Sequence, residues 1–395
     1  MIQDPKVKKA EIIVGIPSYN EADNIDWVVK QVSQGLQKHF PRKSAVIINV
    51  DNNSKDGTKE AFLKAKSSVP KVYLSTRPGV KGKGNNFHNL FKFIKEHSCP
   101  INIVVDADLK SITPDWIRKL GRPIKKGYDF VAPFYNRNKR DALITNHFCH
   151  PLIYALLGRN ISQPIGGDFA FSLEMVEHWL SKKWSKDVYQ FGIDIFMTTE
   201  AIFNNFKICQ AYLGRKVHKP SQLKLDSMFV QVATTLFEQL IINKRFWENK
   251  KVKRIKTFYR DEFKKPQPLS FELQRFKDVC RLGFKADEEI LKKVLTPANY
   301  KRLKGHYRLK RNGIDADFWS KIVYDFLYAY ENFNNKKKLI ETLEVVAFCR
   351  FFYYARLVER MNSGKAEKEI INQARVFREN KNYLLKTEDS DKIKT

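Results

Sequence analysis

INIVVDAD, residues 101–108, decides the fold: a run of β-branched residues ends in two carboxylates, Asp106 and Asp108. A buried strand of this kind leads to its carboxyl end, where open α/β sheets bind their ligands. Two carboxylates so close together repel each other unless a cation lies between them, and hard ions such as Mg²⁺ or Mn²⁺ prefer oxygen ligands. An acidic turn after a strand is the structural alternative, and the pair alone does not choose between the two.

Short apolar runs and helical patterns alternate around this stretch. We expect strands at residues 11–17, 45–51, 72–75, 101–106 and 130–134, and helices at 23–40, 57–67, 85–96 and from Thr113 onward. Thr113 and Pro114 are typical of a helix start. The alternation predicts βαβ units and a mainly parallel sheet.

The pattern changes near residue 220, beyond which the periodicity is mostly helical. We expect helices at residues 229–247, 316–332 and 338–361. The predicted organisation is therefore an α/β domain of residues 1–220 followed by a helical, basic domain of residues 221–395.

Composition limits the function classes without choosing among them. The 395 residues include 72 Lys and Arg against 43 Asp and Glu, a net charge of +29, which favours anionic partners such as nucleotides, phosphorylated metabolites, nucleic acid or acidic membranes. Five scattered cysteines predict reduced thiols and a cytoplasmic protein, not a disulfide framework or a zinc site. No stretch reaches 18 uninterrupted apolar residues and the N-terminus lacks an apolar signal region, so we expect neither a membrane span nor a signal peptide.

Three further segments lie at expected strand ends or helix starts: PSYNE at 17–21, DNNSKDGT at 51–58 and RPGVKGKGN at 77–85. Each of the first two alone is more often an ordinary turn. The third places glycines and cations before a helix, which suits a phosphate, although a flexible basic loop has the same composition. It matches neither the P-loop nor the GxGxxG fingerprint, so the ATPase and Rossmann dehydrogenase classes lose support.

Taken in this order, the segments resemble GT-A glycosyltransferases of the family-2-like kind. In that fold the acidic pair is the DXD motif, which holds a metal on the diphosphate of a sugar nucleotide. The resemblance implies a Rossmann-like GT-A domain in which Lys83 approaches the diphosphate. It also implies nucleotide contacts from Pro17, Tyr19, Glu21, Asp51 and Asp106.

Later motifs narrow the resemblance to mannosylglycerate synthases and glucosyl-3-phosphoglycerate synthases over roughly the first 240 residues. They are PFYNRNKRDALIT at 133–145, QPIGGD at 163–168, FGID at 191–194 and LGRKVH at 213–218. The resemblance implies acceptor contacts from Arg137, Asp141 and Thr145, and donor-sugar contacts from Gly166, Gly167 and Asp168. It implies that Asp106, Asp108 and His218 bind the metal, and that Asp108, Lys83 and Asp194 are catalytic.

The sequence departs from the family pattern at several places. Asp168 stands where the family often has Glu, and Phe191 where a version of the motif has Trp. Lys139 and Arg140 add positive charge to the acceptor segment. They could bind the phosphate of 3-phosphoglycerate, or they could belong to the general basic surface.

The resemblance implies a retaining, metal-dependent hexosyltransferase that moves glucose or mannose from UDP or GDP to glycerate or 3-phosphoglycerate, for compatible-solute synthesis. The cofactor would be Mg²⁺ or Mn²⁺. A polyprenyl phosphate acceptor is an alternative within the same fold. The sequence leaves open the donor, the phosphate on the acceptor and a homodimer.

Nucleic-acid binding is an alternative from another class. Residues 244–265 hold ten Lys and Arg against three acids, interleaved with Phe246, Trp247, Phe258 and Tyr259. Basic residues with aromatics can track a single strand. An amphipathic helix with its aromatics in the core explains the same spacing better, so we do not expect nucleic acid as a partner.

Overall fold

The computed structural model describes residues 9–219, 225–248, 251–260, 273–309 and 313–392. These residues form two compact units that interleave along the chain. Unit 1 takes the described residues of 1–137, 163–224 and 255–267, and unit 2 takes those of 138–162, 225–254 and 268–395. The domain boundary predicted at residue 220 lies outside the described residues and stays a prediction.

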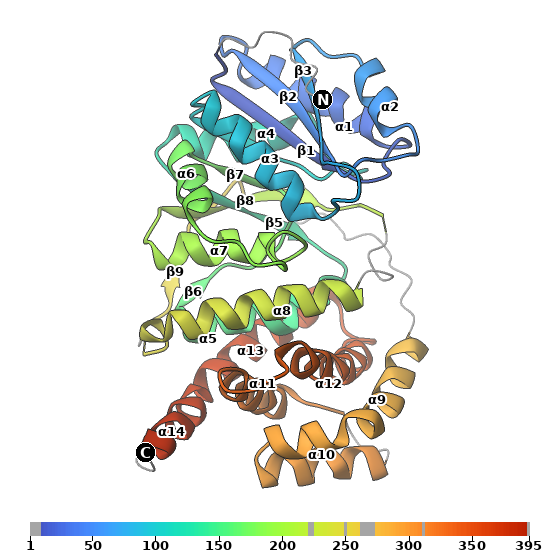
Figure 1. Cartoon of the computed structure of the whole chain (residues 1–395), viewed down its shortest axis with the longest axis vertical. Helices are drawn as coiled ribbons and strands as arrows, with labels where there is room; N and C mark the ends of the chain where they lie inside the picture. The colour runs from blue at the N-terminus through green and yellow to red at the C-terminus, as the bar shows by residue number, and fades with distance from the viewer. Residues whose placement is uncertain (1–8, 220–224, 249–250, 261–272, 310–312, 393–395) are drawn as a thin grey trace. The chain divides into compact units, whose positions relative to one another are not determined.

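Unit 1 is built on an eight-stranded sheet in the order β10-β8-β5-β7-β4-β1-β2-β3 (Figure 1). The strands are β1 (Ile12–Ser18), β2 (Ala45–Asp51), β3 (Lys71–Ser75), β4 (Ile101–Val104), β5 (Phe130–Asn136), β7 (Phe169–Phe171), β8 (Ile208–Arg215) and β10 (Thr257–Phe258). All neighbours pair in parallel except β7, which runs antiparallel to β4 and β5. The residues just before β7 therefore lie at the same edge as the carboxyl ends of β4 and β5.

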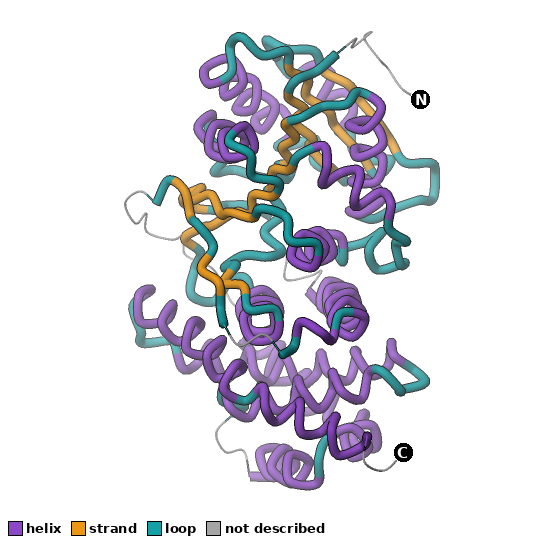
Figure 2. The backbone as a smooth tube through the Cα atoms, turned by 90° about the vertical axis from the view of Figure 1, so that its left-hand side faces the viewer, coloured by secondary structure: helices purple, strands orange, loops and turns teal. Residues whose placement is uncertain are grey.

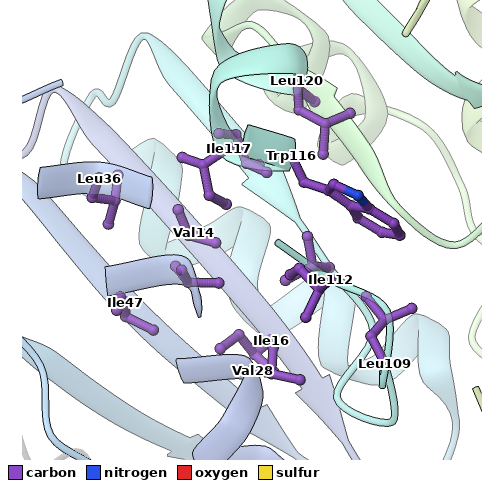
Figure 3. Close-up of a cluster of buried hydrophobic side chains, with 14 of the residues drawn as sticks. Val14, Ile16, Val28, Leu36, Ile47, Leu109, Ile112, Trp116, Ile117 and Leu120 are labelled. Carbon is purple, nitrogen blue, oxygen red and sulfur yellow. The ribbon is translucent and has the colours of Figure 1, made fainter. Parts of the chain in front are cut away.

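Successive side chains of β1 point to opposite faces of this sheet. Val14 and Ile16 face the helices α1 (Ile25–His39) and α4 (Pro114–Lys125), whose apolar side chains complete a buried cluster (Figure 3). On the other face, a Cβ at Gly15 would meet the side chain of Leu90 at 2.3 Å, so α3 (Lys83–Glu96) packs directly on the strand. Both faces are covered, as expected for a mainly parallel sheet.

The predicted α/β fold with a mainly parallel sheet and a helical C-terminal region is confirmed. The remaining helices of unit 1 are α2 (Thr58–Lys64), α6 (Leu173–Ser181) and α7 (Ile193–Phe203). Thr113 is the N-cap of α4 and Pro114 begins the helix, although the Thr113 side chain makes no capping hydrogen bond. The expected list of strands lacked three strands of this sheet, β7, β8 and β10.

Unit 2 is almost entirely helical (Figure 2). Its elements are a π-helical turn (Thr145–Cys149), α5 (His150–Leu156), α8 (Leu225–Ile242), a 3₁₀ turn (Lys244–Phe246), α9 (Leu273–Val294), α10 (Pro297–Leu309), α11 (Ala316–Tyr330), α12 (Lys336–Leu357), α13 (Ser363–Glu379), α14 (Lys381–Lys392) and the short paired strands β6 (Arg159–Asn160) and β9 (Lys253–Arg254). The predicted helix 229–247 is α8 plus the 3₁₀ turn.

One cysteine prediction is wrong. Cys280 of α9 and Cys349 of α12 form a disulfide in unit 2, although all five thiols were expected to be reduced. The two cysteines lie 69 residues apart in sequence and become neighbours because α9 packs along α12. The other three, Cys99, Cys149 and Cys209, are buried.

Among the described residues, one helix is long and apolar enough to cross a membrane by length and composition alone. This helix is α8, and 44% of its apolar stretch is buried inside the structure. Core helices of proteins without a membrane span have the same composition. The finding is therefore weak evidence against the expected absence of a span.

Candidate active site at the carboxyl edge of the sheet

The acidic pair sits in a turn that is held from two sides. The Asp106 N–H donates to Asp168 Oδ1 at 2.9 Å, just before β7. The side chain of Asn24, at the start of α1, donates to the carbonyls of Ala107 (2.8 Å) and Leu109 (3.1 Å). These bonds satisfy the Asp106 N–H and two carbonyls of the turn within the protein itself.

The carboxylate of Asp106 lies between two lysines. Lys83 Nζ is 3.3 Å from Oδ1, and Lys216 Nζ is 2.9 Å from Oδ2. Burial alone would raise the pKa of Asp106, but the ammonium groups of Lys216 and Lys83 outweigh burial and hold it below its ordinary value. Asp106 therefore stays ionised at this edge of the sheet.

Asp168 is fully buried, and both of its oxygens are engaged by the protein. Oδ1 accepts the Asp106 N–H, while Oδ2 accepts the Tyr135 hydroxyl and, at 2.8 Å, Lys216 Nζ. Gly167, in the turn before it, has a φ of +86°. A Cβ there would meet Asp106 Oδ2 at 2.2 Å, so only glycine lets the turn pack against that carboxylate.

Asp194 shares Lys83 with Asp106. Its Oδ2 lies 3.2 Å from Lys83 Nζ, while its Oδ1 is buried without a hydrogen-bond partner in the described part of the chain. Burial is the main cause that raises the pKa of Asp194 above its ordinary value, and Lys83 only partly opposes it. The edge thus holds an acceptor oxygen that is already desolvated.

The loop before α3 is locked onto the segment before α7. The N–H groups of Gly84 and Asn85 donate to the carbonyls of Gln190 and Tyr189, each at 3.0 Å. A Cβ at Gly84 would meet the Val188 carbonyl oxygen at 1.9 Å. The glycine there is needed for this close approach, which fixes Lys83 at the first position of the helix.

Asp108 and His218 are neighbours across the edge. His218 Nδ1 lies 4.0 Å from Asp108 Oδ2, and it donates to the Lys219 carbonyl at 2.7 Å. A neutral ring that donates from Nδ1 carries its lone pair on Nε2, the form that can bind a metal. Burial and the charge of Asp106 raise the pKa of Asp108.

The predicted metal trio is not a preformed shell. Within the described ranges, no three His, Cys, Asp or Glu side chains group closely enough to hold an ion. The reason is that Asp106 faces lysines, whereas Asp108 faces His218.

The segment after β8 is clamped on both sides. The Lys110 N–H donates to the Val217 carbonyl, and the Val217 N–H donates to Ser111 Oγ, both at 2.8 Å. Lys219 Nζ lies 2.7 Å from carboxylate oxygens of both Glu21 and Asp23. His218 is thus fixed between β4 and the loop after β1.

The expected nucleotide residues surround the same edge. Pro17 lies in β1, and the Tyr19 hydroxyl accepts from Lys81 Nζ at 2.8 Å. Asp51 is fully buried and accepts from Ser18 Oγ, Ser54 N, Ser54 Oγ and Tyr73 Oη. Asp51 thus organises the turn after β2, and its direct contact with a nucleotide stays a prediction.

The three expected acceptor residues belong to different units. Arg137 belongs to unit 1, where its Nε donates to Gln163 Oε1 at 2.9 Å. Asp141 and Thr145 belong to unit 2, with Thr145 opening the π-helical turn. Neither unit alone contains the complete set.

Comparison with known proteins decides the family. The family model described as mannosylglycerate synthase, GT domain, matches residues 28–235, more than half of the chain. The chain belongs to the mannosylglycerate synthase GT-domain family. The matched region runs from α1 into α8 and includes residues 138–162 of unit 2.

Relatives of this family member carry two kinds of name. A dolichol-phosphate mannosyltransferase of Pyrococcus furiosus is 29% identical over 42% of this chain and 47% of its own length. A mannosylglycerate synthase of Rhodothermus marinus is 26% identical over 42% of this chain and 45% of its own length. The chain thus spans about half the length of the curated relatives it matches.

Similar structures are also known for part of this family member. A glucosyl-3-phosphoglycerate synthase from Mycobacterium tuberculosis, crystallised with Mn²⁺, UDP and glucosyl-3-phosphoglycerate, is 24% identical with a TM-score of 0.49. The match covers 58% of this chain and 80% of that one.

The extra cations of the acceptor segment have structural partners in this family member. Lys139 Nζ donates to the carbonyls of Glu359 (2.8 Å) and Met361 (2.7 Å), just after α12. Arg140 lies 3.4 Å from the Glu359 carboxylate. A lysine that satisfies carbonyls beyond a helix end is a capping device, so the contacts favour the structural reading over a phosphate site.

Of the basic stretch 244–265, the structure describes residues 244–248 and 251–260, which hold a 3₁₀ turn and the strands β9 and β10 in place of the expected amphipathic helix. Trp247 is 1% exposed, and its indole N–H donates to the Leu240 carbonyl of α8. Phe258 packs against the sheet core of unit 1. These positions favour core packing over stacking on bases, whereas residues 261–265 lie outside the described part.

Sequence reasoning missed two residues at the centre of the site, Lys216 and Tyr135. Tyr135 lies near the carboxyl end of β5, and Lys216 directly follows β8. The available signal was the same one that exposed Asp106, a charged residue at the carboxyl end of an apolar run. It was lost because residues 208–215 were not assigned to a strand.

Proposed function

We propose that this chain is a retaining hexosyltransferase that moves glucose or mannose from a nucleotide diphosphate sugar to glycerate or 3-phosphoglycerate. One observation carries the proposal: Lys83 stands 3.3 Å from Asp106 and 3.2 Å from Asp194, at the edge where Asp108 neighbours His218. An ammonium at a helix start suits a departing diphosphate. Family membership and the name of the R. marinus relative support the glycerate acceptor.

The residues present fit a divalent cation. Asp108 supplies carboxylate oxygen and His218 an imidazole nitrogen, a donor set that suits Mn²⁺ or Mg²⁺. Asp106 adds negative charge beside them and is the third candidate ligand. Positive charge bound here when the cation is present would neutralise the diphosphate as it leaves. His218 is pre-oriented by its bond to the Lys219 carbonyl, which supports such a role.

The chain's own side chains divide the remaining work. Lys83 would stabilise the negative charge that develops on the diphosphate. Asp194 would hold Lys83 through Oδ2 and offer its buried Oδ1 to a donor or acceptor hydroxyl. Gly166 and Gly167 would leave room for the donor sugar beside Asp168. Arg137 would bind the acceptor carboxylate, because a guanidinium pairs with a carboxylate in a planar fork.

A matrix of donors and acceptors tests the proposal. UDP-glucose, GDP-glucose and GDP-mannose would be combined with glycerate, 3-phosphoglycerate or neither, with Mn²⁺, Mg²⁺ or chelator, and released nucleoside diphosphate measured. We expect release that depends on acceptor and cation. Asp108→Asn should lose about 10³-fold in rate, at the upper end for removal of one electrostatic group.

The matched control is Asp26→Asn, an exposed carboxylate in the first turn of α1. It should keep the wild-type rate. Undiminished turnover of Asp108→Asn, or the same nucleotide release without any acceptor, would contradict the proposal.

A polyprenyl phosphate acceptor is the second candidate, favoured by the P. furiosus relative named a dolichol-phosphate mannosyltransferase. The same edge would serve, since only the acceptor changes. Dolichyl phosphate in detergent, offered in parallel with glycerate, separates the two. Transfer to the lipid that exceeds transfer to glycerate would establish this candidate.

A further inference from the structure

Lys216 lies within the motif LGRKVH, which assigns it no role, yet it joins three segments of the site. We propose that Lys216 is a positioning residue that fixes Asp106 against the turn Gly166-Gly167-Asp168. The inference rests on the proposed function, because it assigns Lys216 a task within the same site. It concerns residues of unit 1 alone.

The ammonium group of Lys216 makes three hydrogen bonds within the protein. It donates to Asp106 Oδ2 (2.9 Å), Asp168 Oδ2 (2.8 Å) and the Gly166 carbonyl (2.8 Å). A lysine has three N–H donors, so all of them have acceptors. A diphosphate could gain a bond from Lys216 only if one of these contacts broke, and Lys216 therefore acts through its neighbours.

Asp168 closes the arrangement into a ring. Its Oδ2 accepts Lys216, and its Oδ1 accepts the N–H of Asp106, whose carboxylate returns to Lys216. Both the backbone and the side chain of Asp106 are therefore held by one pair of residues. Tyr135 adds a second donor to Asp168 Oδ2 from β5.

The two lysines of the site differ in what they are able to do. The Lys216 side chain is 4% exposed and its three contacts are at most 2.9 Å long. Lys83 is 17% exposed, and its carboxylate contacts are longer, at 3.2 and 3.3 Å. Lys83 can turn toward a bound diphosphate, whereas Lys216 keeps the carboxylates in place.

Loss of the Lys216 ammonium would leave the buried carboxylate of Asp168 without a cation and the partly buried carboxylate of Asp106 with Lys83 alone. Uncompensated buried charge is strongly unfavourable, so the turn would move or take up water. A shift of about 1 Å in a site of this kind can cost about 10²-fold in rate. The effect would reach the donor without any direct contact from Lys216.

The test begins with hydrogen exchange at the Asp106 amide, which needs no substrate. Lys216→Met should accelerate exchange of this amide at least about 10-fold, because Asp168 loses the contact at Oδ2 that helps to hold its Oδ1 against the Asp106 N–H. Lys216→Arg retains the charge and should restore part of the protection. Lys207→Met, an exposed lysine just before β8, is the matched control and should leave the amide unchanged.

Nucleotide binding provides the second readout. UDP and GDP, each with Mn²⁺, would be titrated into wild type, Lys216→Met, Asp106→Asn and the double variant. If Lys216 acts through Asp106, the double variant should bind no more weakly than the weaker single variant. Losses that multiply would show an independent role and overturn the proposal, as would Asp106 exchange within twofold of wild type in Lys216→Met.

The test still gives an answer if Lys216→Met does not fold or if the wild type binds no nucleotide. If Lys216→Met does not fold, Asp168→Asn removes the same anchor from the other side, and its Asp106 amide should also exchange at least about 10-fold faster. Wild type that binds neither nucleotide would sink the proposed function, while the exchange measurement would still decide the role of Lys216.

Discussion

Lys83 and Lys216 at the carboxyl edge of unit 1 face carboxylates, whereas Arg350, buried in unit 2, faces neutral groups. Burial opposes the charge of Lys83 and Lys216, yet Asp106 and the neighbouring acids raise the pKa of both lysines. Arg350 in α12 donates instead to Gln373 Oε1 and the Ile314 carbonyl, and burial lowers its pKa to about 10. Lys83 and Lys216 thus keep their charge through ion pairs, whereas Arg350 is held by neutral acceptors.

Other ionisable groups of unit 2 follow the same rule. Burial, with smaller contributions from Asp226 and Glu341, raises the pKa of Glu344 to about 8. Burial lowers the pKa of His147 to about 3. Groups pushed toward their neutral forms serve packing, whereas paired charges in a cleft can be redirected to a charged ligand. The comparison thus assigns chemistry to unit 1 and structure to these groups of unit 2.

Lys83→Met tests that assignment and is the substitution with the largest expected effect on activity. We expect kcat/KM for hexosyl transfer to fall about 10²- to 10³-fold, the usual cost of removing one group that stabilises transition-state charge. Lys92→Met, an exposed change further along α3, should keep the rate. Steady-state kinetics with circular dichroism to verify folding would measure this. Equal losses in both variants would mean that general basicity matters, not the position of Lys83.

The strand end before Asp106 and the glycine-rich helix start at Lys83 could be predicted because short apolar runs and glycine-rich turns are local signals. Lys216 could not be linked to Asp106 in the same way, since β8 and β4 are brought together only by the order of the sheet. The reversed strand β7, which delivers Asp168 to the edge, is three residues long and gives little periodicity.

Unit 2 shows a different limit of sequence reasoning. Helices α11 and α12 were expected near their observed positions, because amphipathic spacing is a local property. The Cys280–Cys349 pair depends on the packing of α9 along α12, which no local pattern encodes. Likewise, residues 133–145 read as one acceptor segment, but Arg137 and Asp141 fall in different units.

Gly84→Ala tests whether nucleotide diphosphate binding depends on the position of Lys83 at the start of α3. Alanine favours helices over glycine, so propensity alone would stabilise the start of α3. The Val188 carbonyl, 1.9 Å from the new Cβ, should instead displace the loop and weaken nucleotide diphosphate binding about 10-fold. Isothermal calorimetry would measure the change. Wild-type affinity would show that the loop has room to adjust.

Glu344→Gln tests whether Glu344 of unit 2 is protonated in the folded protein, through the pH dependence of the free energy of unfolding. Between the ordinary value of 4.5 and about 8, the folded protein retains a proton that the unfolded chain has released. Wild-type stability should therefore fall as pH rises through this window, whereas the glutamine variant lacks this term. We expect the variant to gain about 4 kcal/mol relative to wild type between pH 5 and pH 9, since the difference of one proton extends over about three pH units.

Urea unfolding at several pH values would follow the Glu344→Gln difference. Glu379→Gln, the same change at an exposed position of α13, is the matched control and should show no comparable trend. A constant difference between Glu344→Gln and wild type across the pH range would mean that Glu344 is ionised in the folded protein. It would then belong with the paired charges of unit 1.

Gly305→Ala is the smallest change and the counterpart of Gly84→Ala. Gly305 lies inside α10, and a Cβ there would meet nothing within 4 Å. Only helix propensity then operates, so we expect a gain of about 0.5–1 kcal/mol in the free energy of unfolding. Hexosyl transfer should be unchanged. A loss of stability in Gly305→Ala would contradict this expectation. Close backbone approach would then not explain why Gly84 and Gly305 differ in their tolerance of alanine.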